Sequence, residues 1–164
     1  DTPTCADLDR FDGVDEIRPS NFVFFYLMQR SAGVTSDLHL GAAVACPVLG
    51  VYTERHEVLI HGGTVQVSKE RLAGQAGESV DGLLTTGSPA GFGPAIDEAP
   101  LVQISQEHGT LRAAPDHFEQ LLAPLNPGSI VAVYPVHSCQ TCDLNPAYKT
   151  VTGRSILRRR GGAG

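Results

Sequence analysis

The sequence predicts an all-β domain, an antiparallel barrel or sandwich with one short helix. About eight short apolar runs of strand length are spread along the chain. Turn-forming residues separate them, since the 164 residues include 18 glycines and 11 prolines. A stretch with helix-like character is found at residues 115–122. Hydrophobic residues at 41% and charged residues at 18% are ordinary for one globular domain with a core.

The first half of the chain is expected to form a polar connection over residues 6–20 and then a series of strands. The aromatic-rich run and the apolar run after it predict buried strands, the second of them central and bent near Pro47. Gly62 and Gly63 allow a bulge or turn between two later strands. The predicted strands cover residues 21–28, 41–53, 58–60 and 65–68.

The second half contains a region rich in Gly, Ser, Pro and Ala, residues 71–99, where a strand is expected at 79–85 and a long loop elsewhere. Asp116 is placed to cap the helix at 115–122. Residues 106–109 predict a tight turn. Further strands are expected at residues 101–105, 110–112 and 128–134, with a final hairpin at 148–157 around Gly153.

His137 and Cys139 follow the predicted strand 128–134 and are two residues apart. In extended backbone this spacing places an imidazole and a thiol on the same face. Such a pair could hold one zinc ion, with the other coordination positions open to water or substrate. Spacing alone also fits the plainer interpretation of a small buried cysteine and a hydrogen-bonded core histidine.

Cys142 adds a second interpretation, because Cys139 and Cys142 form a C-x-x-C pair. Such a pair can be a redox dithiol or half of a zinc site. No second C-x-x-C completes a four-cysteine site, and Asn145-Pro146 is expected to interrupt any helix after the pair.

Glu107 and His108 place a carboxylate beside an imidazole in the predicted turn. The two groups could transfer a proton or orient a metal ligand. A solvated hairpin tip also explains these residues, and spacing alone favours that plainer interpretation. His61, at the end of a predicted strand, is similarly a possible ligand or a structural residue.

Composition argues against several classes of protein. The net charge of −6 argues against a nucleic-acid partner. No apolar run is long enough for a membrane span, and no secretory leader is found. Four cysteines, two of them in one short motif, do not suggest a disulfide framework. A reducing, cytoplasmic location is therefore expected.

Five segments, in this order along the chain, resemble one family. Their order and spacing are similar to the C-terminal end of the D-serine dehydratase / D-threonine aldolase family, pyridoxal-phosphate enzymes of the alanine-racemase-like fold. The segments are DTPTC at 1–5, EIRPSNFVFFYLMQ at 16–29, ERHEVLIHGGTVQVSKE at 54–70, SQEHG at 105–109 and PVHSCQTCDL at 135–144, followed by Tyr148 and Gly153.

The resemblance implies a division of the chain. Residues 1–20 would be a remnant of the (β/α) cofactor barrel with its connection, and residues 21–164 the dehydratase-like β domain. Asp1 and Thr2 match residues that help hold the cofactor phosphate. The upstream barrel and its Schiff-base lysine are not in this chain, so a longer enzyme is expected. A homodimer is also implied, in which this domain approaches the partner's barrel.

The resemblance further implies a lyase that uses pyridoxal phosphate and a divalent metal, expected to be zinc, on a D-β-hydroxy amino acid. His137 and Cys139 would hold the metal, and Glu107 and His108 match a motif near the active site. The aldolase version carries Asp in place of the cysteine, so D-serine dehydratase-like chemistry is favoured. Phe25-Tyr26 stands where the family typically has Tyr-Asp, which removes a carboxylate.

Two other functions remain open from the sequence. The isolated chain could be a non-catalytic β domain that binds metal weakly or only packs against a barrel. It could also be a thiol redox module that uses Cys139 and Cys142.

Overall fold

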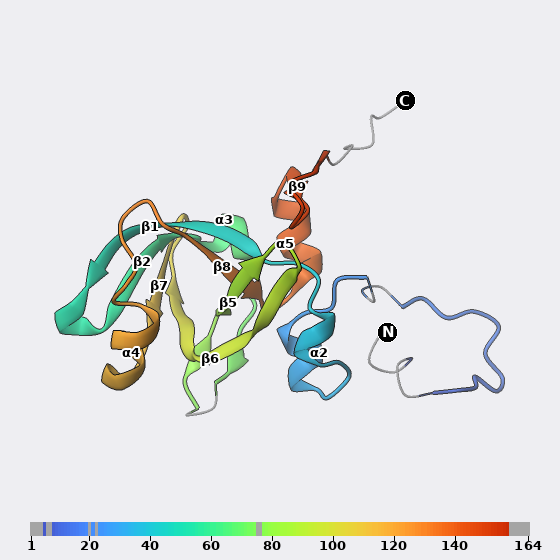
Figure 1. Ribbon diagram of the computed structural model, residues 1–164. Coiled ribbons are helices and arrows are strands. Elements are labelled where there is room, and N and C mark those ends of the chain that lie inside the picture. The colour runs from blue at the N-terminus through green and yellow to red at the C-terminus, as the bar shows by residue number, and fades with distance from the viewer. Residues whose placement is uncertain (1–4, 6–7, 20, 22, 75–76, 158–164) are drawn as a thin grey trace.

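Antiparallel strands close into a barrel, which confirms the all-β prediction in its barrel form (Figure 1). The structure is a computed structural model and describes residues 5, 8–19, 21, 23–74 and 77–157. The barrel strands are β1 (Val44–Tyr52), β2 (Glu57–His61), β5 (Gly82–Ser88), β6 (Gly91–Ile104), β7 (His108–Arg112) and β8 (Ile130–Pro135). They are hydrogen-bonded in the order β1-β2-β7-β6-β5-β8, and β8 pairs again with β1.

Short helices and small hairpins surround the barrel, and they are more numerous than the one helix that was expected. The helices are α2 (Leu27–Ser31), α3 (Thr64–Val67), α4 (Pro115–Leu121), α5 (Ser138–Leu144) and the 3-10 turns η1 (Asp37–His39) and η2 (Thr53–Arg55). The outer strands are β3 (Leu72–Ala73), β4 (Ser79–Val80), β9 (Ala147–Lys149) and β10 (Ser155–Leu157). Pairing of β9 with β10 confirms the predicted final hairpin. No helix in the described ranges is both long enough and apolar enough to cross a membrane.

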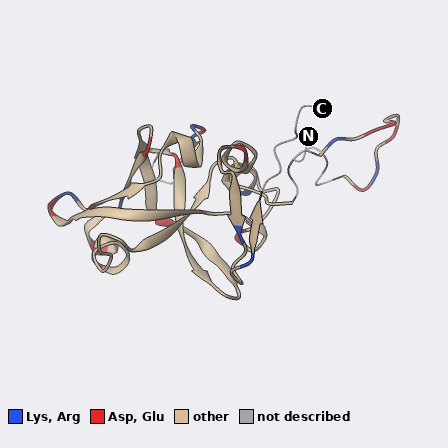
Figure 2. Ribbon diagram, turned by 90° about the horizontal axis from the view of Figure 1, so that it is seen from above, with Lys and Arg blue, Asp and Glu red and all other residues tan. Residues whose placement is uncertain are grey.

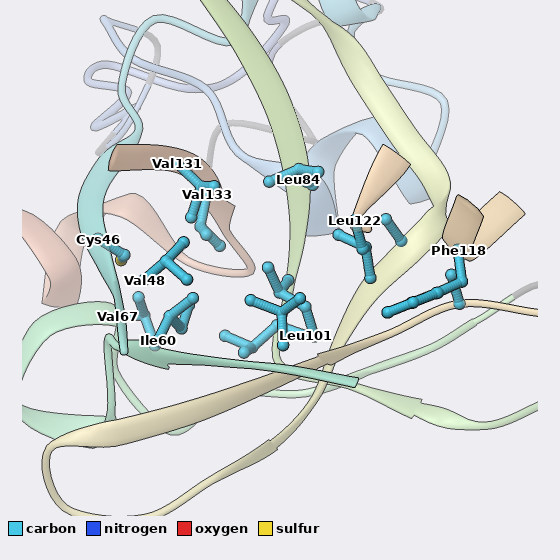
Figure 3. Close-up of a cluster of buried hydrophobic side chains, with 14 residues drawn as sticks. Cys46, Val48, Ile60, Val67, Leu84, Leu101, Phe118, Leu122, Val131 and Val133 are labelled. Carbon is cyan, nitrogen blue, oxygen red and sulfur yellow. The ribbon is translucent and has the colours of Figure 1, made fainter. Parts of the chain in front are cut away.

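The barrel interior is filled by aliphatic side chains that alternate along the strands. Cys46 and Val48 of β1 converge there with Ile60 of β2 (Figure 3). Phe118 of α4 is fully buried at the edge of this cluster. Burial raises the pKa of the Cys46 thiol to about 12, so this cysteine is a packing residue. Lys and Arg are spread over several segments of the chain (Figure 2).

The strand directions decide which residues meet at one end of the barrel. β2 ends at His61, β7 begins at His108, and β8 ends at Pro135. Because all ladders in the barrel are antiparallel, these three points lie at the same end. Helices α3 and α5 lie at this end and α4 at the other (Figure 1). The segments that carry the candidate residues are therefore brought together by topology.

Two predicted strands are wrong. In the strand predicted at residues 21–28, Phe25 takes a left-handed backbone (φ 46°) that breaks the extended run, and α2 follows. In place of the strand predicted at residues 65–68, residues 64–67 form the one-turn helix α3. Its first amides are satisfied from outside: Thr64 donates to the carbonyl of Ser105 at 2.9 Å and Val65 to that of Gln106 at 3.2 Å. These bonds override the alternating pattern of the segment.

The loop expected around residues 87–94 is also wrong, because these residues form the β5–β6 hairpin. Its backbone is held by Thr85 and Tyr134, whose hydroxyls donate to the carbonyl of Gly93 at 2.9 and 2.8 Å. The helix near 115–122 is confirmed as α4, but Asp116 is not its cap. Ala114 is the N-cap residue and Asp116 lies within the first turn. Helix α5, directly after β8, was not expected.

Asp81, between β4 and β5, is a buried carboxylate. Its side chain is 0% exposed, and Arg71 donates to Oδ1 at 2.8 Å. Its Oδ2 has no hydrogen-bond partner among the described residues. Burial raises the pKa of Asp81, and the bond from Arg71 opposes this rise without reversing it.

We expect Asp81 to make the free energy of unfolding fall as the pH rises. The folded protein binds this proton more tightly than the unfolded chain, whose Asp pKa is about 3.9. The extra stability from protonation of Asp81 is fully present below the pKa of the unfolded chain. It is lost as the pH rises through the raised pKa that Asp81 has in the folded protein. Urea unfolding between about pH 3.5 and 7 should show this loss in the wild type relative to Asp81→Asn. If the difference in unfolding free energy between the wild type and Asp81→Asn stays the same across this range, the prediction is contradicted. Asp116→Asn, which changes an exposed carboxylate, is the control.

Candidate functional site

His137 and Cys139 lie at the corner between β8 and α5. His137 is the N-cap residue of α5 with extended backbone (φ −139°, ψ 107°), whereas Cys139 is already inside the helix. The expected extended geometry is therefore wrong at Cys139, because the chain turns into a helix at Ser138. Both residues remain accessible, with His137 half-buried and Cys139 exposed.

Tyr26 lies against His137. Its ring meets the His137 ring edge-on, with centroids 4.7 Å apart and planes at 72°. Burial raises the pKa of Tyr26, and the nearby Cys139 raises it further. The hydroxyl is therefore protonated at neutral pH. The sequence interpretation had placed Tyr26 in a core strand and gave no sign of this contact.

Glu70 is close enough to His137 for the two groups to interact electrostatically. Burial alone would raise the pKa of Glu70, but the Ser68 hydroxyl, backbone amides and the charge of His137 lower it on balance. Ser68 is buried and donates to Oε2 of Glu70 at 2.5 Å. A carboxylate that stays ionised beside an imidazole favours the binding of a cation nearby. Glu70 is half-buried, and no motif in the sequence indicates that it reaches this corner.

Helices α3 and α5 are joined by side-chain hydrogen bonds. The Thr141 hydroxyl lies 3.0 Å from the carbonyls of both Val67 and His137. The Asn145 amide donates to the carbonyl of Gln66 at 2.9 Å. These contacts hold the segment that carries Ser68 and Glu70 against the start of α5. A hollow of about 410 Å³ lies between the two helices, lined by Thr64, Ser68, Lys69, Gln140, Asp143 and Leu144.

Glu107 and His108 are exposed at the turn between β6 and β7, at the same end of the barrel. His108 pairs with His61 across the β2–β7 ladder, and their ring centroids are 6.3 Å apart. The bonds from α3 to Ser105 and Gln106 connect this turn to α3, and so indirectly to α5. Among the described residues, no three His, Cys, Asp or Glu side chains form a cluster suited to a metal. Glu107 and His108 thus lie at the same end of the barrel as the pair His137–Cys139.

The remaining predicted site residues divide into two groups. Asp1 and Thr2 lie outside the described residues, so their proposed contact with a cofactor phosphate stays a prediction. Cys139 and Cys142 both carry thiols rather than a disulfide, and α5 spans them. The interruption expected at Asn145-Pro146 is confirmed, since α5 ends at Leu144, but a helix containing both cysteines was not expected.

The donors at this corner suit a soft or borderline divalent metal. An imidazole and a thiol are the ligand types that zinc prefers. Two ligands leave positions for a substrate or for groups from elsewhere in a larger protein.

Comparison with known proteins places these features in a family. Residues 41–151 match the model of a family described as a putative serine dehydratase domain. The chain is 29% identical over 158 residues to D-threo-3-hydroxyaspartate dehydratase of Delftia sp. (strain HT23), covering 92% of the chain and 39% of that protein. It is 29% identical over 154 residues to D-serine dehydratase of Saccharomyces cerevisiae (strain ATCC 204508 / S288c), covering 87% of the chain and 32% of that protein. The chain therefore spans about two fifths or less of the length of these relatives.

Solved structures share the fold. A mutant of D-threo-3-hydroxyaspartate dehydratase with one cysteine replaced by alanine, in the metal-free form, has a TM-score of 0.79 at 24% identity, covering 98% of this chain and 43% of that one. A mutant of the same enzyme with one histidine replaced by alanine has a TM-score of 0.78 at 24% identity, with coverage of 98% and 42%.

Proposed function

Because the chain belongs to the putative serine dehydratase domain family, we propose that it is the C-terminal part of a pyridoxal-phosphate- and metal-dependent lyase acting on D-β-hydroxy amino acids. The relatives named D-serine dehydratase and D-threo-3-hydroxyaspartate dehydratase support dehydratase chemistry. The proposal includes the division at residue 20 between a remnant of the cofactor barrel and the β domain.

One observation carries the metal part of the proposal. The two solved mutants of the hydroxyaspartate dehydratase replace a histidine and a cysteine that are two positions apart, and the cysteine mutant is in a metal-free form. His137 and Cys139 have the same residue types and spacing. They lie at an accessible corner whose donors suit zinc. Bound there, zinc would act as a Lewis acid on the β-hydroxyl of the substrate.

We propose a role for each of the candidate residues. His137 and Cys139 hold the metal, and the Glu70 carboxylate adds negative charge near His137. Glu107 and His108, at the same end of the barrel, are proposed to transfer protons. Asp1 and Thr2 are proposed to contact the phosphate of pyridoxal phosphate, which supplies the electron sink when bound. The thiolate ligand favours D-serine dehydratase-like over D-threonine aldolase-like chemistry, because a carboxylate in its place would suit a harder ion.

The direct test is the metal content of the chain after incubation with zinc and removal of excess. We expect about one zinc per wild-type chain and none in His137→Ala or Cys139→Ala. Cys142→Ala is the matched control, since it removes a thiol three residues away on the same helix and should retain the metal. Absence of zinc from both the wild-type chain and the intact protein would contradict the proposal.

A second candidate function rests on the C-x-x-C pair. Cys139 and Cys142 are one helical turn apart in α5, a separation at which a disulfide can form after small adjustments. A thiol redox module predicts that a mild oxidant forms this disulfide readily and that the protein needs no metal. If an alkylating agent still modifies both cysteines after the oxidant has been applied, as measured by mass spectrometry, both thiols are free and this function is excluded.

A further inference from the structure

Two segments that reach the corner at His137 and Cys139, here called the metal corner, each carry a residue with strained backbone. Phe25 (φ 46°) directly precedes Tyr26, and Ser68 (φ 75°) lies two residues before Glu70. A left-handed conformation is unfavourable for a bulky residue such as Phe and persists only where surrounding contacts impose it.

The segments on both sides of Phe25 are bonded to the chain neighbours of His137. The amide of Met28 donates to the carbonyl of Val136 at 3.2 Å, and the Asn21 side chain donates to the Ser138 hydroxyl at 2.5 Å. Gln29 closes the arrangement by donating to the carbonyl of Asn21 at 3.1 Å. These three bonds hold α2 and the corner at His137 in one fixed relation.

Arg30 fixes the other side of α2. Its guanidinium donates to both carboxylate oxygens of Asp97 in β6, at 3.0 and 2.8 Å, and lies 2.6 Å from the carboxylate of Asp37. Such a bidentate pair restricts both position and orientation. The strained turn at Phe25 therefore aims the Tyr26 ring from a rigid base.

Tyr26 is the side chain that packs against the His137 ring. Within the part of the chain that the structure describes, no hydrogen bond reaches either nitrogen of this ring, and its side-chain contact is the edge-on Tyr26 ring at 4.7 Å. Histidine ligands of metals are ordinarily oriented by a hydrogen bond to the second ring nitrogen. Phe25 is itself half-buried and packs against a buried apolar cluster that includes Leu27, so core packing helps to hold its strained backbone, while the adjacent Tyr26 ring meets His137.

We propose that Tyr26 is a positioning residue of the metal site, whose ring fixes the rotation of the His137 imidazole in place of a hydrogen bond. The inference rests on the proposed function and concerns a residue at which this chain departs from the family pattern. Both nitrogens of His137 then remain available, one for the metal and one for a group from the rest of the protein. A planar side chain at position 26 is required, and its hydroxyl is not.

The test is the zinc affinity of the full chain, measured by competition with a chromophoric chelator. We expect Tyr26→Ala to bind zinc about 10- to 100-fold more weakly than the wild type, the usual loss when a group that orients a ligand is removed. Tyr26→Phe keeps the ring and should bind as the wild type does. Tyr26→Leu fills the space without a planar ring and should resemble Tyr26→Ala. Tyr52→Ala, a similar change to an exposed tyrosine in β1, is the control and should have no effect.

A second measurement separates positioning from a general loss of stability. Cobalt bound in place of zinc has absorption bands that report its coordination geometry. These bands should change in Tyr26→Ala and Tyr26→Leu and be preserved in Tyr26→Phe. Wild-type affinity and spectrum in Tyr26→Ala, or a loss in Tyr26→Phe as large as in Tyr26→Ala, would overturn the inference. Retention of zinc by His137→Ala would instead overturn the proposed function, so the two failures are distinguishable.

Discussion

Replacing His137 with alanine in the intact protein, supplied with pyridoxal phosphate and zinc, should lower the rate of D-serine dehydration about 10³-fold. His137 is one of two side chains proposed to hold the metal, and alanine leaves Cys139 alone to bind it. A Lewis acid at the leaving hydroxyl contributes several kcal/mol to the transition state, and about 4 kcal/mol corresponds to a factor of about 10³. The measurement is the initial rate of ammonia release at saturating D-serine.

The matched control is His117→Ala, because His117 is an exposed histidine in α4 at the opposite end of the barrel. It should retain the wild-type rate. A His137→Ala protein that turns over D-serine at the wild-type rate would contradict the metal role of this residue, whatever its zinc content. A protein that keeps its zinc and loses its rate would point to proton transfer by His137 instead.

The strands that form the barrel could be predicted where apolar residues dominate. The runs that form β1, β2 and β8 could be predicted because each is a short apolar run of strand length. Residues 64–67 were misassigned because the bonds that make them a helix come from Ser105 and Gln106, far away in the chain. The β5–β6 hairpin was missed because its Gly and Pro residues indicate a loop, whereas its pairing is imposed by neighbouring strands.

The candidate site was predictable to the extent that it is local in sequence. His137 and Cys139 stand out as a pair at a strand end, although the helix that begins at Ser138 was not foreseen. Tyr26 and Glu70 reach the same corner from segments more than sixty residues away. No spacing rule connects them to His137, because the barrel topology and the bonds between α3 and α5 bring them there. Their discovery required the three-dimensional arrangement.

Replacing Gly63 with alanine should lower the free energy of unfolding by about 3 kcal/mol, the upper part of the usual range for forcing a methyl group into filled space. A Cβ atom at this position would lie 2.5 Å from the carbonyl oxygens of both Ser105 and Gln106. These are backbone atoms in the β6–β7 turn, so they cannot move aside as a flexible side chain would. The same two carbonyls accept the first amides of α3, so the substitution should break those bonds as well.

Gly87→Ala makes the same change where a Cβ atom would meet only the Phe92 ring at 3.9 Å, an ordinary contact. Urea unfolding should therefore show a large loss for Gly63→Ala and a change within about 0.5 kcal/mol for Gly87→Ala. Equal stabilities of the two variants would show that the β6–β7 turn can move away from α3.

Because α3 carries the chain to Ser68 and Glu70, the expected separation of α3 from the turn should also weaken zinc binding at His137. A loss of stability without any loss of zinc affinity would mean that α5, and not α3, determines the position of the metal pair.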